Sequence, residues 1–427
     1  MPCRGVTIAS ERDCASPLAM TPRTVLFVHQ SGPAQFRHLI RHMHASDEWS
    51  PVLLRMKGTR KRGSDGLPDN VPVFEYQPLR SSSSQHDVTA DAEAKLIRGE
   101  SVLAAGRALL QKGMSHPSAI VAHPGWGEAL FLKEVFPYSP QLHFCEYYYA
   151  AANQDLGFDP EFPITDRDVV KALSKNLNNA LSLLQADALY APTRWQASTY
   201  PEPFRSSIEV IHDGVDTAEL DAARASAVRP DGERWITYVN RAFEPMRGAH
   251  IFCRALPQIL ASAPDLRVQI IGGEASQRPY SPGASTTAVE QWLKPLLDGP
   301  DGHRILHTPY LKRPEYLAAL ARSSCHVYLT NPFVLSWSLI EAMGLGLPIV
   351  ASDTAPVRDA IRHQQEGRLV PYPAPEALAA GVCWALEHPA EMAAMAERAR
   401  LRVAYEFSLQ QVCLPRQMQL IESLIRL

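Results

Sequence analysis

The stretch CHVYLTNPFVLSWSLIEAMGLGLPIVASD, residues 325–353, decides the fold. It opens with an apolar run of strand length at 326–330, and a turn that contains proline follows. Ser336 then stands at an N-cap position before a short predicted helix, 337–344, which ends among glycines ahead of a proline. The apolar residues 349–351 resume a strand. This order of strand, loop, helix and strand predicts a parallel sheet with a right-handed crossover.

The start of this predicted helix has the properties of an anion-binding site. Its free N–H groups carry partial positive charge, and Ser336 and Ser338 are small enough to let a ligand approach closely. Glu341 lies more than one helical turn further in, where a carboxylate can accept two hydrogen bonds from a diol such as a ribose. The spacing alone nevertheless favours an ordinary capped helix with a solvent-facing glutamate.

Composition narrows the class of protein. A chain of 427 residues indicates two or more domains, and a net charge of −3 argues against a nucleic-acid partner. The seven cysteines form no C-x-x-C pair and no zinc-finger spacing, so neither structural zinc nor a disulfide framework is expected. A cytoplasmic location fits this usage best. No apolar run approaches the ~18 residues of a transmembrane helix, while a peripheral membrane contact stays open.

Both halves of the chain alternate predicted strands with predicted helices. TVLFVH at 24–29 opens the first half and WITYV at 235–239 opens the second. This repetition predicts an α/β protein with two Rossmann-like, doubly wound domains that face each other across a cleft. The expected organisation is a loose tail at 1–21, an N-terminal domain at 22–215, a linker at 216–231, a C-terminal domain at 232–405 and a final helix at 406–427.

Polar residues follow several predicted strands at their carboxyl ends, where ligands of α/β proteins bind. His123 follows the strand 119–122 and precedes a glycine-rich turn, a place that suits a ligand, although a helix cap is the alternative. Gly32 lies in the turn after the first strand. Gln35 and Arg37 follow it, where a solvated helix face is equally compatible.

A long irregular connection follows the predicted strand 142–145. It begins with Glu146, Tyr147 and Tyr148 and continues as a polar, turn-rich segment to residue 163. Connections of this length inside a compact domain are often functional. The alternative is an aromatic patch buried against the following helix.

Several of these motifs resemble the retaining GT-B glycosyltransferases of family four, also called glycosyl transferases group one. Glu341-Ala342-Met343, then Gly346-Leu347-Pro348 and the strand 349–352, are similar to the second half of the family signature. In that family two glutamates flank seven residues, and the second, which binds the nucleotide ribose, corresponds to Glu341. The first, which binds hydroxyls of the donor sugar, corresponds to Phe333, so this chain departs from the pattern there.

Further segments extend the resemblance over nearly all of the chain after residue 24. HPGWGE at 123–128 and the segments EYYY and GFDPEFP at 146–163 look like those of a bacterial subgroup, and HDGVD at 212–216 resembles the domain-junction motif. The resemblance implies the GT-B fold, with an N-terminal acceptor domain, a C-terminal nucleotide-sugar donor domain and a last helix that crosses back to the first domain.

The resemblance also implies roles for the candidate residues. Arg241 and Arg247 correspond to the Arg and Lys that bind the donor diphosphate, and two cations there would neutralise the leaving group. Two surface arginines are the alternative. With His123 at the donor sugar, they form the predicted catalytic set. The predicted donor-binding set is Gly32, Gly272, Gly273, Tyr310, Ser336, Trp337, Ser338 and Glu341. The predicted acceptor set is Gln35, Arg37, Glu146, Tyr147 and Tyr148.

The predicted activity is transfer of a sugar from a UDP- or GDP-sugar to an unidentified hydroxyl acceptor, with retention of configuration. No residue stands out as a covalent nucleophile, so front-face attack assisted by the leaving phosphate is expected. No Asp-x-Asp follows a predicted strand to demand a metal. The resemblance likewise implies that no metal or other cofactor is required. A sugar-nucleotide epimerase, a phosphorylase and a non-catalytic sugar-nucleotide-binding protein remain as alternatives, the last suggested by Phe333.

Overall fold

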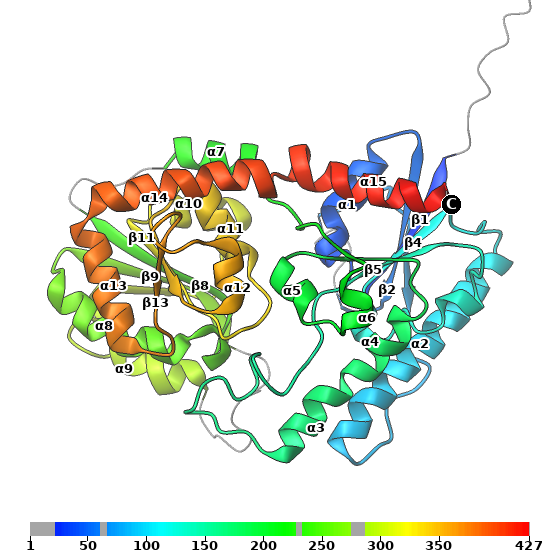
Figure 1. The fold of residues 1–427 in the computed structure, drawn as a ribbon, viewed down its shortest axis with the longest axis horizontal. Coiled ribbons are helices and arrows are strands. Elements are labelled where there is room, and N and C mark those ends of the chain that lie inside the picture. The colour runs from blue at the N-terminus through cyan, green and yellow to red at the C-terminus, as the bar shows by residue number, and fades with distance from the viewer. Residues whose placement is uncertain (1–21, 60–65, 228–232, 275–286, 427) are drawn as a thin grey trace, which may run out of the picture.

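The computed structural model describes residues 22–59, 66–227, 233–274 and 287–426. The chain forms two lobes, each built on a parallel sheet (Figure 1). The tail predicted at 1–21 lies outside the described residues, as do residues 228–231 of the predicted linker. The rest of that linker contains the helix α7 (Thr217–Ala225).

The first lobe holds a seven-stranded sheet in the order β3-β2-β1-β4-β5-β6-β7. The chain winds outward from β1 to β3, returns to the middle and winds the other way from β4. The carboxyl ends of β1 and β4 therefore flank a switch point, where ligands of such sheets bind. The strands are β1 (Arg23–Val28), β2 (Trp49–Met56), β3 (Val73–Tyr76), β4 (Ala119–Ala122), β5 (Gln141–Phe144), β6 (Ala188–Ala191) and β7 (Ile208–Val210).

Helices cover both faces of this sheet, as the side chains of β1 illustrate. Val25 and Phe27 join the core cluster that includes α1 (Arg37–His44) and α15 (Leu414–Ile425). Leu26 and Val28 join the cluster that includes α2 (Asp87–Gln111). Alternate residues of a strand point to opposite faces, so an apolar run such as this one must be buried on both. The helices of this lobe are α1 (Arg37–His44), α2 (Asp87–Gln111), α3 (Asp166–Ser174), α4 (Asn176–Leu183), α5 (Arg194–Ser198) and α6 (Glu202–Arg205).

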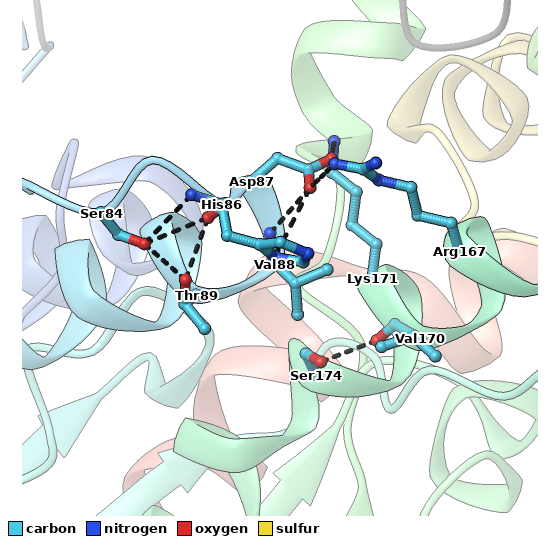
Figure 2. Close-up of polar contacts among 9 residues, drawn as sticks. All are labelled: Ser84, His86, Asp87, Val88, Thr89, Arg167, Val170, Lys171 and Ser174. Carbon is cyan, nitrogen blue, oxygen red and sulfur yellow. Dashed lines mark hydrogen bonds and ion pairs between the residues drawn. The ribbon is translucent and has the colours of Figure 1, made fainter.

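An exposed ion-pair group connects α2 to α3 (Figure 2). Asp87, in the first turn of α2, pairs with Arg167 at 2.7 Å and with Lys171 at 3.5 Å. The hydrogen bond from Arg167 is the main cause that lowers the pKa of Asp87 to about 2. Exposed pairs of this kind contribute little to stability.

The second lobe repeats the winding in a six-stranded sheet with the order β10-β9-β8-β11-β12-β13. Its switch point lies between β8 and β11. The strands are β8 (Arg234–Phe243), β9 (Leu266–Glu274), β10 (Ile305–Thr308), β11 (Cys325–Tyr328), β12 (Ile349–Ser352) and β13 (Arg368–Val370). The helices are α8 (Ala249–Ser262), α9 (Lys294–Leu297), α10 (Arg313–Ala321), α11 (Trp337–Gly344), α12 (Ala355–Ala360), α13 (Pro375–Glu387) and α14 (Pro389–Arg402).

The last helix, α15 (Leu414–Ile425), returns to the first lobe (Figure 1). Leu414, Ile421 and Leu424 pack in the core cluster with β1, and Gln417 Nε2 donates to the His212 carbonyl oxygen at 3.1 Å. The predicted fold class, with its two doubly wound domains and its returning helix, is confirmed. Within the described ranges, no helix combines the length and hydropathy that a bilayer crossing requires.

Candidate active site

Three polar side chains of the first lobe meet beyond the carboxyl ends of three adjacent strands. Gln35 follows β1, His123 follows β4 and Glu146 follows β5. The Glu146 carboxylate uses both oxygens, one 2.8 Å from Gln35 Nε2 and the other 3.2 Å from His123 Nε2. The structure thus brings together three of the residues predicted from the sequence, next to the switch point of the sheet.

The hydrogen bonds of His123 define its tautomer. Its Nδ1 accepts from the Gly125 N–H at 3.1 Å, so in the neutral ring the proton lies on Nε2, which faces Glu146. The ring is buried and lies 5.0 Å from the ring of His29 and 5.9 Å from that of Trp126. His123 therefore caps the turn that follows β4, the role that the sequence analysis gave as the alternative to ligand binding. Its Nε2–H also faces Glu146 at the end of β5.

Glu146 is held in its charged form. Burial alone would raise the pKa of this carboxyl, but the hydrogen bond and charge of His123, the hydrogen bond of Gln35 and the charge of Arg241 outweigh it and lower the pKa. Arg241 is an exposed residue in the irregular part of β8, where the register with β9 shifts. The charge of Arg241 thus reaches Glu146 from the opposite lobe.

Arg247 reaches the loop that precedes α11. Its Nη1 donates to Thr330 Oγ1 at 3.0 Å and to the Val334 carbonyl oxygen at 2.8 Å. Gly248 follows with a φ of +73°, and a Cβ there would lie 2.6 Å from Leu329 Cβ. Only glycine fits this left-handed, crowded turn, which lets the backbone carry Arg247 against the loop.

Phe333 lies in the same loop, at the position of the missing glutamate. Its ring centroid is 5.4 Å from Arg247 Cζ and 4.8 Å from the ring of Tyr147, a buried residue of the first lobe. The Tyr147 hydroxyl donates to Asp155 Oδ1 at 2.7 Å. In place of a carboxylate, the loop therefore offers an aromatic ring that packs across the two lobes.

The first turn of α11 faces the first lobe. Ser336 caps this helix by accepting from the Ser338 N–H at 3.4 Å, and Ser338 Oγ donates to Ser336 Oγ at 3.0 Å. Trp337 is 38% exposed, and its Nε1 donates to Asp213 Oδ2 at 2.8 Å. Asp213 belongs to the segment after β7, so this hydrogen bond joins the two lobes beside the start of α11. The sequence motif HDGVD marked this segment, but nothing in it indicated the contact with Trp337.

Replacing Asp213 with asparagine is expected to stabilise the protein at neutral and higher pH. Burial raises the pKa of Asp213 from 3.8 to about 7, against the opposing effect of the hydrogen bond from Trp337. The folded state therefore retains a proton that the unfolded state releases, so stability falls as pH rises from 3.8 to about 7 and stays reduced above it. Asparagine keeps an acceptor for Trp337 without the charge.

Thermal unfolding at pH values of about 5 and about 8 measures this effect. The advantage of Asp213→Asn over the wild type should be larger at the higher pH, by on the order of 2 kcal/mol. An advantage that is equal at both pH values would contradict the raised pKa.

Glu341 is buried, which excludes the solvent-facing glutamate that the spacing favoured. One carboxylate oxygen pairs with Arg313 and the other accepts from the Tyr316 hydroxyl at 2.6 Å. Arg313 also binds Glu219 of α7 at 2.7 Å. The carboxylate is thus fixed by α10. Sequence reasoning missed Arg313 and Tyr316, because they stand in a segment whose pattern indicates only the start of a helix.

Of the three predicted glycines, Gly272 lies at a close backbone contact. Gly272 has a φ of +156°, and a Cβ there would approach the Asn240 carbonyl oxygen to 2.2 Å. Gly273 follows it in β9, where a Cβ would lie 3.7 Å from the Pro309 carbonyl oxygen. Gly32 is buried, and its carbonyl oxygen accepts from Arg55 Nη1 at 3.1 Å.

Three predicted residues, Tyr310, Tyr148 and Arg37, take part in none of the contacts described above. Tyr310 is 78% exposed, and Tyr148 packs its ring 5.5 Å from that of Tyr200 beside the core. Arg37 lies at the start of α1, 3.4 Å from the His38 ring. The ligand-binding roles of these three residues stay predictions.

Family comparisons match each lobe separately. Residues 52–220 match the family described as "Glycosyl transferase family 4 group", and residues 233–388 match "Glycosyl transferases group 1". The chain is 30% identical over 208 residues to a phosphatidyl-myo-inositol mannosyltransferase of Mycobacterium tuberculosis. The aligned region covers 46% of this chain and 48% of that protein. It is 24% identical over 227 residues to a D-inositol 3-phosphate glycosyltransferase of Rhodococcus erythropolis. That aligned region covers 48% of this chain and 47% of the relative. The matched region spans about half the length of these curated relatives.

Solved structures share the fold over nearly the whole chain. A sucrose-phosphate synthase from Thermosynechococcus elongatus has a TM-score of 0.70 at 18% identity, covering 95% of this chain and 99% of that one. Anabaena HepE in complex with UDP-glucose has a TM-score of 0.67 at 15% identity, covering 95% of this chain and 100% of that one. With a family match in each lobe and the GT-B fold throughout, the chain belongs to the glycosyl transferases of family 4, also described as group 1.

Proposed function

We propose that the protein transfers a glycosyl group from a UDP- or GDP-sugar to an acceptor hydroxyl, with retention of configuration. The observation that carries this proposal is the placement of Arg241 and Arg247. Arg247 binds the loop before α11, and Arg241 acts on Glu146 from the opposite lobe. One cation thus contacts the loop before a helix start, and the charge of the other acts on a polar strand end of the first lobe; a diphosphate leaving group would be neutralised by both.

The donor is held mainly by the second lobe in this proposal. Arg241, Arg247 and the first N–H groups of α11 neutralise the diphosphate and the charge that develops on it as it leaves. Glu341 accepts hydrogen bonds from the ribose. A carboxylate has about four lone-pair positions, so the contacts with Arg313 and Tyr316 orient it without filling it.

The reaction centre lies at His123 and Glu146. The bond between the anomeric carbon and the phosphate oxygen breaks, and the acceptor oxygen attacks from the same face. The acceptor proton passes to the leaving phosphate, so no covalent intermediate is needed. Glu146, kept ionised by His123, Gln35 and Arg241, faces the positive charge that develops on the sugar.

Phe333 stands where the family has the glutamate that binds hydroxyls of the donor sugar, so this protein must bind its donor differently. It packs on Tyr147, so the hydroxyls of the donor sugar meet an aromatic ring in place of a carboxylate. The same observation favours a second candidate function, a sugar-nucleotide-binding protein without catalysis. An epimerase of the same fold class would act on the nucleotide sugar alone.

We propose that transfer requires no metal or other cofactor, because Arg241 and Arg247 supply the positive charge that a metal would bring. The partners are a nucleotide sugar and a hydroxyl acceptor that the contacts do not identify, and no nucleic acid. A peripheral membrane contact stays open. We place the protein in the cytoplasm, where nucleotide sugars are made.

A thermal-shift panel of nucleoside diphosphates and their sugars, followed by mass spectrometry of reactions with hydroxyl acceptors, tests the function. Stabilisation by one nucleotide together with an acceptor heavier by one sugar supports transfer. Conversion of the donor without any acceptor would identify an epimerase instead. Binding without turnover would leave the non-catalytic function.

A further inference from the structure

The segment 150–163, here called the strap, leaves the first lobe after β5 and contacts the second lobe before the chain returns to α3 (Figure 1). Its base is fixed in the first lobe by Gln154, a buried residue. The side chain of Gln154 accepts from the Ala150 N–H at 2.7 Å and donates to the Tyr148 carbonyl oxygen at 2.8 Å. The strap is therefore anchored where it departs.

The far end of the strap meets α8 through a buried hydrogen-bonded pair and an exposed ion pair. Asp159 Oδ2 lies 2.8 Å from His250 Nε2, and these residues are 5% and 0% exposed. Glu161 binds Arg254 through both oxygens, at 2.5 and 2.7 Å, and both partners are more than a third exposed. Phe162 covers the His250 ring at 5.2 Å. The Asp159–His250 pair is thus the buried contact of the strap.

The buried contact with His250 lies close in sequence to Arg247. His250 stands in the first turn of α8, three residues after Arg247. A second route runs through Phe158, whose ring stacks on that of Tyr372 at 6.0 Å. The Tyr372 hydroxyl donates to Asn331 Oδ1 at 3.1 Å, beside the loop residues that accept from Arg247.

We propose that the strap is a positioning element of the donor site, in which Asp159, acting through His250, fixes the first turn of α8 and with it Arg247. This inference rests on the proposed function, because it assigns the strap a purpose in binding a nucleoside diphosphate. It makes Asp159 and His250 positioning residues. They touch neither the donor nor the acceptor, and they couple the first lobe to the diphosphate site in the second.

The Arg254 charge disfavours a metal site at this cluster. Ligand atoms of Asp159, Glu161 and His250 lie within 4.8 Å of one another, close enough to share an ion. Both Glu161 oxygens, however, already accept from Arg254, and the charge of that guanidinium would oppose a bound cation. Hydrogen bonds from His250 and the Glu161 N–H also outweigh the burial of Asp159 and lower its pKa, so this carboxylate stays charged beside His250.

Asp159→Ala compared with Glu161→Ala tests the proposal, because the second variant removes the exposed pair between the same strap and the same helix. Hydrogen exchange without ligand should accelerate about tenfold or more in the first turn of α8 for Asp159→Ala, with little change for Glu161→Ala. The Kd for UDP or GDP and the KM for the donor should rise about tenfold for Asp159→Ala only. At saturating donor, kcat should also fall for Asp159→Ala, because a displaced Arg247 stabilises the transition state less well, and it should stay unchanged for Glu161→Ala.

Asp159→Asn, which keeps an acceptor oxygen for His250, should restore most of the affinity. If Asp159→Ala does not fold, Phe158→Ala tests the second route and should raise KM in the same direction. Equal exchange and equal KM for Asp159→Ala and Glu161→Ala would overturn the proposal. If the wild type binds neither UDP nor GDP, the proposed function fails, while the exchange comparison still decides whether the strap fixes α8.

Discussion

Replacing Arg247 with alanine is expected to lower kcat/KM for glycosyl transfer by a factor of about 10² to 10³, the usual effect of removing a group that stabilises developing negative charge. Arg247 is suited to this role because the left-handed turn at Gly248 and the contacts with Thr330 and Val334 hold its guanidinium beside the start of α11. Most of the loss should appear in kcat, since charge on the leaving diphosphate grows toward the transition state.

Three further variants make this result specific. Arg247→Lys keeps the cation and should retain a large part of the activity. In Arg241→Ala, kcat/KM should fall by a factor of about 10² or more, as it does in Arg247→Ala. Arg267→Ala removes an exposed arginine of the same lobe, which pairs with Glu233, and should leave the rate unchanged. Steady-state kinetics with the donor identified by the nucleotide panel measure all four. An unchanged kcat/KM in Arg241→Ala or Arg247→Ala would reject the diphosphate assignment.

His123→Ala is expected to lower kcat by a factor of about 10² at saturating donor, a typical effect for a positioned proton-bearing side chain at a reaction centre. The imidazole orients the Glu146 carboxylate through Nε2 and is itself fixed by the Gly125 N–H. Its removal takes away the largest of the interactions that keep Glu146 ionised against burial.

The pH dependence separates this role from a general loss of structure. The pKa of Glu146 should rise in His123→Ala, because burial then acts with less opposition, so the acid limb of the rate profile should move to higher pH. His44→Ala removes a surface histidine that contacts Asn70 and serves as the control. A full rate in His123→Ala, or an acid limb that does not move, would contradict the assignment.

The fold could be predicted because its signals are local. Buried strands such as 24–29 and 235–239 show as apolar runs, and the strand–helix–strand unit at 325–353 specifies parallel pairing. The amphipathic pattern of residues 165–186 predicts one long helix, but the structure divides it at Lys175 into α3 and α4, and no glycine or proline stands at the break. Boundaries of this kind depend on packing against α2, which the sequence pattern does not contain.

The candidate site could be predicted only where a motif or a strand end marks the residue. Gln35, His123 and Glu146 each follow a predicted strand in a segment that resembles the family, and the structure joins them by hydrogen bonds. The partners that orient Glu341 and the contact of Asp159 with His250 could not be predicted, since each joins residues far apart in the chain. Such contacts follow from tertiary packing, and a single sequence carries no local trace of them.

A crystal structure with the nucleoside diphosphate that the thermal-shift panel selects tests the central claim most directly. The account predicts both phosphates within hydrogen-bond distance of Arg241, Arg247 and the first N–H groups of α11, and the ribose hydroxyls on Glu341. A diphosphate bound away from both arginines, or a ribose that leaves Glu341 untouched, would contradict it.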